Sequence, residues 1–245
     1  MKLLVHGADG RLGSLIVGLA ERETDVKVTK GGRKADLETL LPACDVAIDV
    51  SRPAGTIALV KAAAVTATPL VIGTTGFSAV EQCLLDEQAA RLPVLLAPNF
   101  SLGVNLLFWL VQKAAGLLGP DYRVEIVEMH HELKRDAPSG TARRLGEAVA
   151  AARGQNYEQV VRHGRAGPDG ARTADEVGMH SLRGGDIAGE HTVFLIGQGE
   201  RLELTHRAAN RELFARGALR AARWLQGKPP GRYGMGDVLG LPPAA

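Results

Sequence analysis

The chain has 245 residues, enough for one or two domains, and its 45% hydrophobic and 23% charged residues are ordinary for a soluble globular protein. The 29 basic and 27 acidic residues leave a net charge of +2, which argues against a general nucleic-acid binder. We see no uninterrupted apolar run of the roughly 18 residues that a membrane span needs, no apolar signal-peptide core and no zinc-type cysteine spacing. We therefore expect a cytoplasmic protein with no nucleic-acid or membrane partner.

The first hundred residues alternate between short apolar runs and segments of helical period. Such alternation indicates βαβ units and a parallel sheet covered on both faces, the doubly wound α/β arrangement of a Rossmann domain. The expected strands cover residues 2–6, 26–29, 46–50, 70–72 and 94–97, and the expected helices cover 11–22, 54–65 and 79–91.

The pattern changes after residue 97, where strands begin to follow one another without intervening helices. This is typical of an antiparallel or mixed sheet in an α+β domain. We expect a dinucleotide-binding domain over 1–101 plus 212–245, and a C-terminal α+β domain over 102–211. The expected elements here are helices at 102–118, 139–153 and 211–226 and strands at 123–128, 177–183, 191–196 and 201–207.

A glycine-rich loop lies between the first strand and the first helix. Glycines allow a tight turn and close approach of a pyrophosphate, whose charge then faces the amides at the helix N-terminus. The spacing is GxxGxxG, so the context carries more weight than the pattern, and the alternative is a turn without a ligand. The candidate cofactor-binding residues of this loop are Gly7, Ala8, Asp9, Gly10, Arg11 and Leu12.

The end of the second strand lacks the acidic residue that usually binds the adenine ribose of NAD. Lys30, Arg33 and Lys34 lie there instead, and cations at this place could pair with a 2′-phosphate. We predict that NADPH is used at least as well as NADH, with Lys30 and Arg33 as candidate ligands. The alternative is a solvated basic turn.

Two further loops follow strands of the predicted sheet, where a doubly wound fold binds its ligand. Gly73, Thr74 and Thr75 form one loop, and Ala97, Pro98, Asn99 and Phe100 form the other. Their small and hydroxyl-bearing side chains suit contact with a nicotinamide and its ribose, although each motif alone would be an ordinary turn.

The segment from Glu128 to Thr141 joins a strand end to a helix start. Its histidines and lysine offer positive charges or protons, and the amides of Gly140 and Thr141 are candidates to bind a carboxylate. Adjacent histidines on an extended chain point to opposite faces, so only one of them needs to face a ligand. A metal site would need a further ligand such as Glu128, His180, His191 or His206, and the spacing selects none; we predict no metal.

These motifs together resemble the dihydrodipicolinate reductase family, also called 4-hydroxy-tetrahydrodipicolinate reductases, over nearly the whole chain. The resemblance rests on the Gly7–Gly13 loop, the signature E-x-H-H-x-x-K-x-D-A-P-S-G-T-A over 128–142, and further matches at 49–53, 73–76, 99–105, 183–191 and 206–208. The chain departs from the family in the short connection over 30–45, where relatives often carry the ribose-binding acid.

The resemblance implies an oxidoreductase of lysine (diaminopimelate) biosynthesis that reduces a cyclic dicarboxylate with NADPH or NADH. It implies that His130 and Lys134 are catalytic, and that a homotetramer is built through the second domain, which also binds the substrate. Which of the two residues delivers the proton stays open. The implied substrate-binding residues are His131, Ser139, Gly140, Thr141 and Thr75.

Two other functions compete with this interpretation. A different two-domain nicotinamide oxidoreductase would share the glycine loop but would not need the Pro-Ser-Gly-Thr turn for carboxylates. A non-catalytic dinucleotide sensor would keep the loop and tolerate the loss of Lys134.

Overall fold

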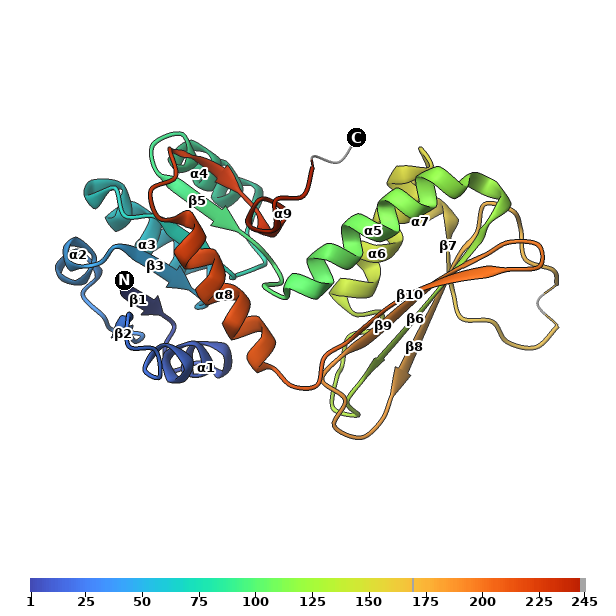
Figure 1. Ribbon diagram of the computed structural model, residues 1–245, viewed down its shortest axis with the longest axis horizontal. Helices are drawn as coiled ribbons and strands as arrows, with labels where there is room; N and C mark the ends of the chain where they lie inside the picture. Colours follow the sequence, from blue (N-terminus) through green and yellow to red (C-terminus); the bar gives the residue numbers. More distant parts are fainter. Residues whose placement is uncertain (169, 243–245) are drawn as a thin grey trace. The chain divides into compact units, whose positions relative to one another are not determined.

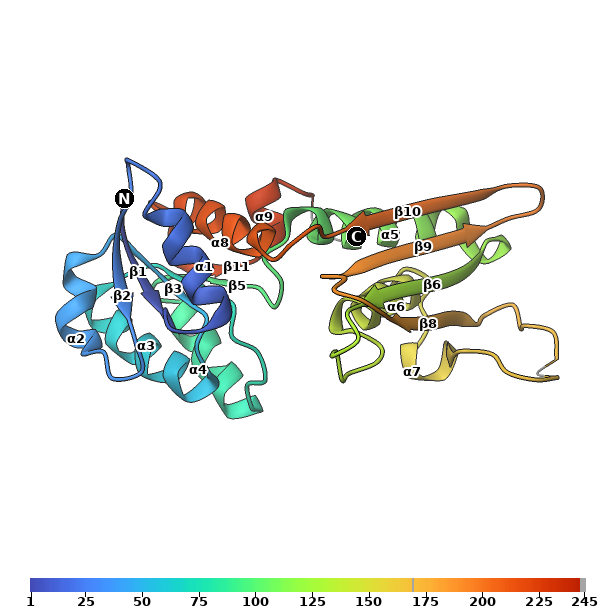
Figure 2. The ribbon, with the colours of Figure 1, turned by 90° about the horizontal axis from the view of Figure 1, so that it is seen from below.

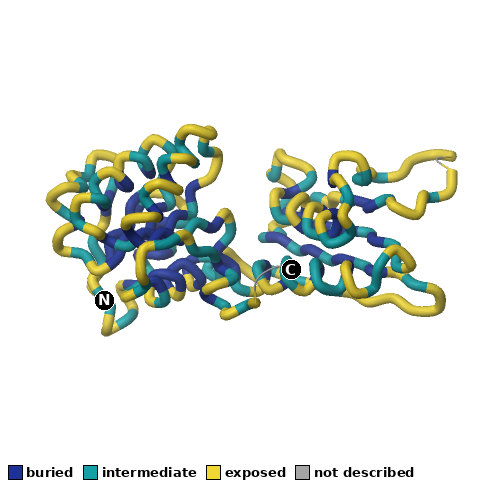
Figure 3. Tube along the Cα trace, turned by 90° about the horizontal axis from the view of Figure 1, so that it is seen from above, coloured by how far each residue is buried: buried dark blue, intermediate teal, exposed yellow. Residues whose placement is uncertain are grey.

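The computed structural model describes residues 1–168 and 170–242, which form two compact units. The first unit contains Met1–Leu102 together with residues 211–242, and the second contains Gly103–Asn210. Each unit has its own sheet and its own buried side chains (Figure 3).

The first unit is built on a six-stranded sheet in the order β11-β5-β4-β3-β1-β2 (Figure 1). Every neighbouring pair in this sheet is parallel, which confirms the predicted Rossmann-type α/β class. The order reverses at β1, so the carboxyl ends of β1 and β3 mark the switch point where such folds bind ligands. The strands are β1 Lys2–His6, β2 Lys27–Gly31, β3 Val46–Asp49, β4 Leu70–Ile72, β5 Pro93–Leu96 and β11 Gly231–Tyr233.

Helices cover both faces of the first sheet because its strand residues alternate between two cores. Leu3 and Val5 of β1 pack with α1 (Arg11–Ala20), α8 (Glu212–Leu225) and α9 (Met235–Leu239). Leu4 packs on the other face, in a core that includes side chains of α3 (Pro53–Thr66) and α4 (Ala79–Ala89).

Short helices that the sequence does not predict connect some of these strands and helices. The helix α2 (Leu37–Leu40) and the 3-10 helix η1 (Leu41–Ala43) connect β2 to β3, and Asp36 caps α2 by accepting a hydrogen bond from the Thr39 amide. A helix of only three or four residues makes about one turn, which is too short to show a helical period in the sequence.

The second unit contains a five-stranded mixed sheet in the order β10-β9-β6-β8-β7, which agrees with the expected mixed sheet (Figure 2). β6 pairs in parallel with β8 and antiparallel with β9, so β6 lies at the centre. The strands are β6 Arg123–His130, β7 Val161–His163, β8 Val177–Arg183, β9 Glu190–Ile196 and β10 Arg201–Arg207, and the helices are α5 Leu102–Leu118, η2 Gly119–Asp121, α6 Gly140–Ala152 and α7 Tyr157–Val160.

One face of the second sheet packs against α5 and α6, as Figure 2 shows. Along β6 the buried side chains are those of every second residue, from Val124 to His130. This alternation puts Glu128 and His130 on the same face as the core residues Val124 and Ile126.

Helix α5 is the most apolar helix of this unit. By length and composition alone, the segment Leu102–Asp121 could cross a membrane. Polar residues such as Asn105 and Lys113 interrupt it, so it does not form an uninterrupted apolar run in the sequence. In the structure Leu107, Val111 and Ala115 of this helix are buried in the core of the second unit.

Candidate active site

The glycine loop follows β1 and opens α1 as expected. Gly7 adopts φ +85, and a Cβ at Gly13 would overlap the Gly7 carbonyl oxygen, so both positions require glycine. Gly10 is the N-cap of α1 and offers no side-chain hydrogen bond to the first turn, in which no acidic residue lies. These exposed helix amides therefore suit an external anion such as a pyrophosphate.

The turn after β2 carries the predicted cations, but they are not equivalent. Lys30 forms an exposed ion pair with Glu21, at 2.9 Å between Nζ and Oε1. Glu21 is the C-cap of α1 and so lies at the opposite end of that helix from the glycine loop. Arg33 and Lys34 are exposed and form no ion pair among residues 1–168 and 170–242. Of the three cations, Arg33 and Lys34 are thus the ones available to a ligand.

The two loops after β4 and β5 are tied to the sheet by buried contacts. The Asp49 carboxylate, fully buried at the end of β3, accepts a hydrogen bond of 2.7 Å from the Thr74 hydroxyl. A Cβ at Gly73 would overlap the ring of buried Phe100, so the predicted loops 73–76 and 97–100 pack against each other. The Asn99 side chain accepts from the Ser101 amide at 2.8 Å and shapes the second loop.

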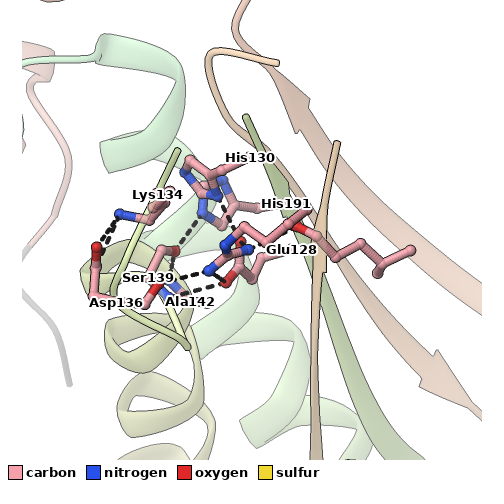
Figure 4. A network of polar contacts seen from close by, with 9 residues as sticks. Glu128, His130, Lys134, Asp136, Ser139, Ala142 and His191 are labelled. Atoms are coloured by element: carbon pink, nitrogen blue, oxygen red, sulfur yellow. Dashed lines mark hydrogen bonds and ion pairs between the residues drawn. The ribbon is translucent and has the colours of Figure 1, made fainter. Parts of the chain in front are cut away.

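Glu128 lies at the centre of the site in the second unit, as the close view in Figure 4 shows. Its side chain is fully buried and accepts two hydrogen bonds of 2.9 Å from the Arg183 guanidinium. It also faces His130 Nδ1 at 2.5 Å and accepts from the Ser139 amide at 3.1 Å. Burial alone would raise the pKa of Glu128, but the hydrogen bonds from His130 and Arg183 outweigh it, and the pKa falls far below its usual value.

The contact with Glu128 sets the orientation of the His130 ring. Because an ionised carboxylate can only accept a hydrogen bond, Nδ1 must carry the proton, which leaves Nε2 as the nitrogen for other partners. Nε2 faces Gly189, where a Cβ would come within 3.0 Å, and Gly189 has φ +153. A side chain at position 189 would fill the space in front of this nitrogen.

Lys134 lies on the turn that follows β6. Its ammonium bonds both oxygens of the exposed Asp136 carboxylate at 2.8 Å. The same turn is held from the other side, where Arg183 donates to the Asp136 carbonyl oxygen at 2.6 Å. Arg183 therefore contacts both the carboxylate that orients His130 and the turn that carries Lys134.

Helix α6 begins at the predicted Pro-Ser-Gly-Thr turn. The buried Ser139 hydroxyl accepts from the Ala142 amide at 3.1 Å and contacts His191 Nε2 at 2.9 Å. The exposed Gly140 has open space around its Cα. Thr141 follows it in the first turn of α6, so both amides are near the positive end of the helix dipole.

His191 is buried beside His130, with the two ring centroids 5.2 Å apart. Burial, together with a smaller effect of the neighbouring His130, lowers the pKa of His191 to about 3. His191 is therefore neutral at physiological pH. Among the described residues we find no group of three or more His, Cys, Asp or Glu that could hold a metal ion.

The structure brings together His130, Ser139 and the turn that carries Lys134, whereas Thr75 belongs to the first unit. His131 is half-buried, and its amide donates to the Ile187 carbonyl at 2.8 Å. Sequence reasoning had considered Glu128 and His191 only as metal ligands and had assigned no role to Arg183. The strand alternation could have placed Glu128 beside His130, but the register that pairs His130 with Arg183 is not readable from one sequence.

Comparisons with known proteins agree with this geometry. Residues 1–100 match the family model described as dihydrodipicolinate reductase, N-terminus, and residues 103–239 match dihydrodipicolinate reductase, C-terminus. The chain is 50% identical over 242 residues to a 4-hydroxy-tetrahydrodipicolinate reductase of Akkermansia muciniphila, with 98% of each chain covered. It is 46% identical to the enzyme of the same name from Syntrophotalea carbinolica, over 98% of this chain and 99% of that one.

A solved structure shares the fold. It is titled dipicolinate-bound dihydrodipicolinate reductase from Paenisporosarcina sp. TG-14, and it superimposes with a TM-score of 0.79 at 23% identity, over 97% of this chain and 98% of that one. The family resemblance predicted from the sequence is thereby confirmed: the chain belongs to the dihydrodipicolinate reductase family.

Proposed function

We propose that the chain reduces 4-hydroxy-tetrahydrodipicolinate to tetrahydrodipicolinate with a nicotinamide cofactor, a step of lysine biosynthesis through diaminopimelate. The observation that carries the proposal is a buried carboxylate, Glu128, that contacts both His130 and the Ser139 amide at the start of α6. Arg183, which donates to Glu128, also donates to the Asp136 carbonyl oxygen and so links this cluster to the turn that carries Lys134. A dicarboxylate needs cationic and amide donors, and a reduction with loss of water needs a positioned proton donor.

The first unit fits the cofactor. The uncapped start of α1, with glycines where a Cβ would collide, suits the pyrophosphate, and the loops at the ends of β4 and β5 suit the nicotinamide end. When bound, the cofactor supplies the hydride. We assign Gly7 to Leu12 to the pyrophosphate and adenosine, and residues 73–75 and 97–100 to the nicotinamide half.

The second unit binds and protonates the substrate in this proposal. The amides of Gly140 and Thr141 receive one carboxylate at the start of α6, beside Ser139 and His131. Lys134 and His130 provide the positive charge and the proton, because reduction of a conjugated carbon leaves electron density that must be protonated. Thr75, from the first unit, is proposed as a further substrate contact.

Lys134 is tested by substitution. The variant Lys134→Ala removes the ammonium while leaving Glu128 and His130 in place, so we expect turnover to fall on the order of 100-fold with nearly unchanged cofactor affinity. Steady-state rates and a fluorescence titration of the reduced cofactor measure the two effects. Lys61→Ala, at an exposed lysine of the first unit, is the matched control. A comparable loss of cofactor affinity in Lys134→Ala contradicts the assigned role.

The activity itself is tested by a coupled assay. Dihydrodipicolinate synthase generates the unstable cyclic substrate, and oxidation of NADPH or NADH is followed by absorbance. We expect synthase-dependent oxidation. If neither cofactor is oxidised in the presence of the synthase product, the proposed function is wrong.

For the cofactor we propose that NADPH is used at least as well as NADH. Support comes from the exposed, unpaired Arg33 and Lys34 after β2, whereas the pairing of Lys30 with Glu21 weakens the case for Lys30. The double variant Lys30→Ala, Arg33→Ala should lower kcat/KM for NADPH more than for NADH. A ratio of the two kcat/KM values that is unchanged from wild type would contradict the proposal.

We further propose a cytoplasmic homotetramer assembled through the second unit. The sheet face opposite α5 and α6 carries Met129, Leu182, Phe194 and Ile196, of which Leu182 is 46% exposed and Ile196 37%. The same face also carries charged residues such as Glu125, and exposed apolar side chains among polar ones suit burial against a second copy of the chain. Light scattering of Phe194→Lys should show smaller assemblies than wild type, and an unchanged mass would contradict this surface as the interface.

A further inference from the structure

The turn after β2 lacks an acidic residue of its own, yet a carboxylate lies at that turn. Gly32 is the first residue beyond β2, and a Cβ built on it would come within 2.8 Å of Asp9 Oδ2. All three nearest atoms to that position belong to the Asp9 carboxylate. The glycine loop thus places the Asp9 carboxylate beside the position that a Cβ of residue 32 would occupy.

Backbone contacts hold the glycine loop against this turn. The amides of Gly7 and Ala8 both point at the Gly31 carbonyl oxygen, at 2.9 and 3.4 Å. Gly31 is the last residue of β2 and pairs with His6 in the parallel ladder. Asp9 is therefore placed by the sheet register and not by a loose surface turn.

The Asp9 side chain is exposed and has no hydrogen bond or ion pair among the described residues. Its oxygens are available to a ligand bound over the glycine loop. In dinucleotide-binding domains an acid at the end of the second strand bonds the adenine ribose hydroxyls of NADH and repels the 2′-phosphate of NADPH. Gly32 makes room for Asp9 to take this place.

We propose that Asp9 is the residue that binds the adenine ribose hydroxyls, and that it sets the share of NADH against NADPH by opposing the nearby cations Arg33 and Lys34. This inference rests on the proposed function, because it concerns the cofactor of the same reaction. It assigns Asp9 a role different from that of the other loop residues, which face the pyrophosphate through their amides.

The test compares Asp9→Asn with wild type in the full-length protein. The asparagine keeps the shape and removes the charge, so we expect kcat/KM for NADH to fall about tenfold while the value for NADPH stays constant or rises. Dissociation constants of NADH and NADPH, from nicotinamide fluorescence without substrate, should shift in the same direction. Glu38→Gln removes an equally exposed charge from α2 and should leave both cofactors unchanged.

A double variant tests the position directly. Asp9→Gly combined with Gly32→Glu moves the acid to the residue after β2, where the three nearest atoms to a Cβ belong to Asp9, and should restore the binding of NADH that Asp9→Gly alone loses. A cofactor ratio in Asp9→Asn within about twofold of wild type would overturn the proposal, as would an equal loss of both cofactors. The titrations need no turnover, so a protein that binds NADH through Asp9 but reduces no substrate would refute the proposed function alone.

Discussion

Among the described residues, each unit contains one fully buried carboxylate close to the carboxyl end of a strand, Asp49 on β3 and Glu128 on β6. Both fix the loops around them, but their partners differ. Asp49 accepts from three hydroxyls, those of Ser51 at 2.6 Å, Thr56 at 2.5 Å and Thr74 at 2.7 Å. His6 Nε2 lies 4.0 Å from it, too far for a hydrogen bond. The buried Asp49 carboxylate is therefore bound by neutral hydroxyl donors.

The negative charge of Glu128 is instead balanced by the guanidinium of Arg183. Arg183 donates to both of its oxygens, so the carboxylate has a permanent counter-charge whatever the protonation state of His130. His130 can then gain and lose a proton without leaving a buried charge unpaired. The unit expected to do proton chemistry thus balances its buried acid with arginine, while the unit expected only to bind uses hydroxyls.

The largest expected effect comes from removing the charge of Glu128. Glu128→Gln replaces one carboxylate oxygen by an amide NH2 group, which leaves the Arg183 guanidinium without its counter-ion and either His130 or the Ser139 amide without its acceptor. We therefore expect a loss of about 3–5 kcal/mol in the free energy of unfolding. We also expect kcat to fall on the order of 100-fold with a changed pH profile and a smaller change in KM. Denaturant titration and pH–rate profiles measure these effects.

The control for Glu128 is an exposed pair in the same unit. Glu203→Gln breaks the surface ion pair with Arg201 and should change stability by less than about 1 kcal/mol. If Glu128→Gln kept a wild-type pH profile for kcat, the orienting role of Glu128 would be disproved even with the stability loss present.

The next largest effect is expected at Asp49. In Asp49→Asn the new amide group can accept from fewer hydroxyls and brings a donor toward them, which should cost roughly 2–3 kcal/mol of stability. Because Thr74 would lose its anchor, KM for the reduced cofactor should rise while kcat changes little. If kcat fell as strongly in Asp49→Asn as in Glu128→Gln, Asp49 would not act on cofactor binding alone, and the two carboxylates would not differ in role.

The framework of both units could be predicted from the sequence because most of its elements have either a clear period or a short apolar run bounded by turn residues. The helix over 102–118 and the strand over 70–72 match α5 and β4 at both ends. The glycine loop and the His-His-Lys segment were found from residue types that permit few alternatives. Contacts between residues far apart in the sequence could not be predicted. Arg183 contacts Glu128 across the paired strands β6 and β8, and the Asp9 carboxylate lies beside Gly32. Contacts between distant residues leave no periodic trace in one chain.

Acidification should lower the free energy of unfolding through His191 of the second unit. Its pKa is about 3 in the folded protein against 6.5 as its ordinary value, so the unfolded chain binds a proton between these pH values that the folded chain does not. Stability is therefore lost as the pH falls below 6.5, by about 2 kcal/mol between pH 7 and pH 5.

His191→Gln isolates this contribution. The glutamine keeps a polar atom near Ser139 but cannot titrate, so the variant should lose about 2 kcal/mol less than wild type over the same pH range. Urea titrations at pH 7 and pH 5 provide the comparison. Parallel losses in both proteins would show that His191 is protonated in the folded state as well.

The smallest expected effect distinguishes two serine caps. Ser78 caps α4 in the first unit and Ser139 caps α6 in the second, each by accepting from the amide three residues later. Replacing Ser78 by alanine should cost about 1 kcal/mol of stability, since it removes one cap. Ser139→Ala should cost more, because it also leaves the buried His191 Nε2 without its partner. Only Ser139→Ala should also raise KM for the dicarboxylate substrate, because only Ser139 begins the helix whose first amides are proposed to receive a carboxylate. Equal KM values in the two variants would mean that Ser139 acts as a cap alone, and the substrate-binding role of the turn would then have to rest on Gly140 and Thr141.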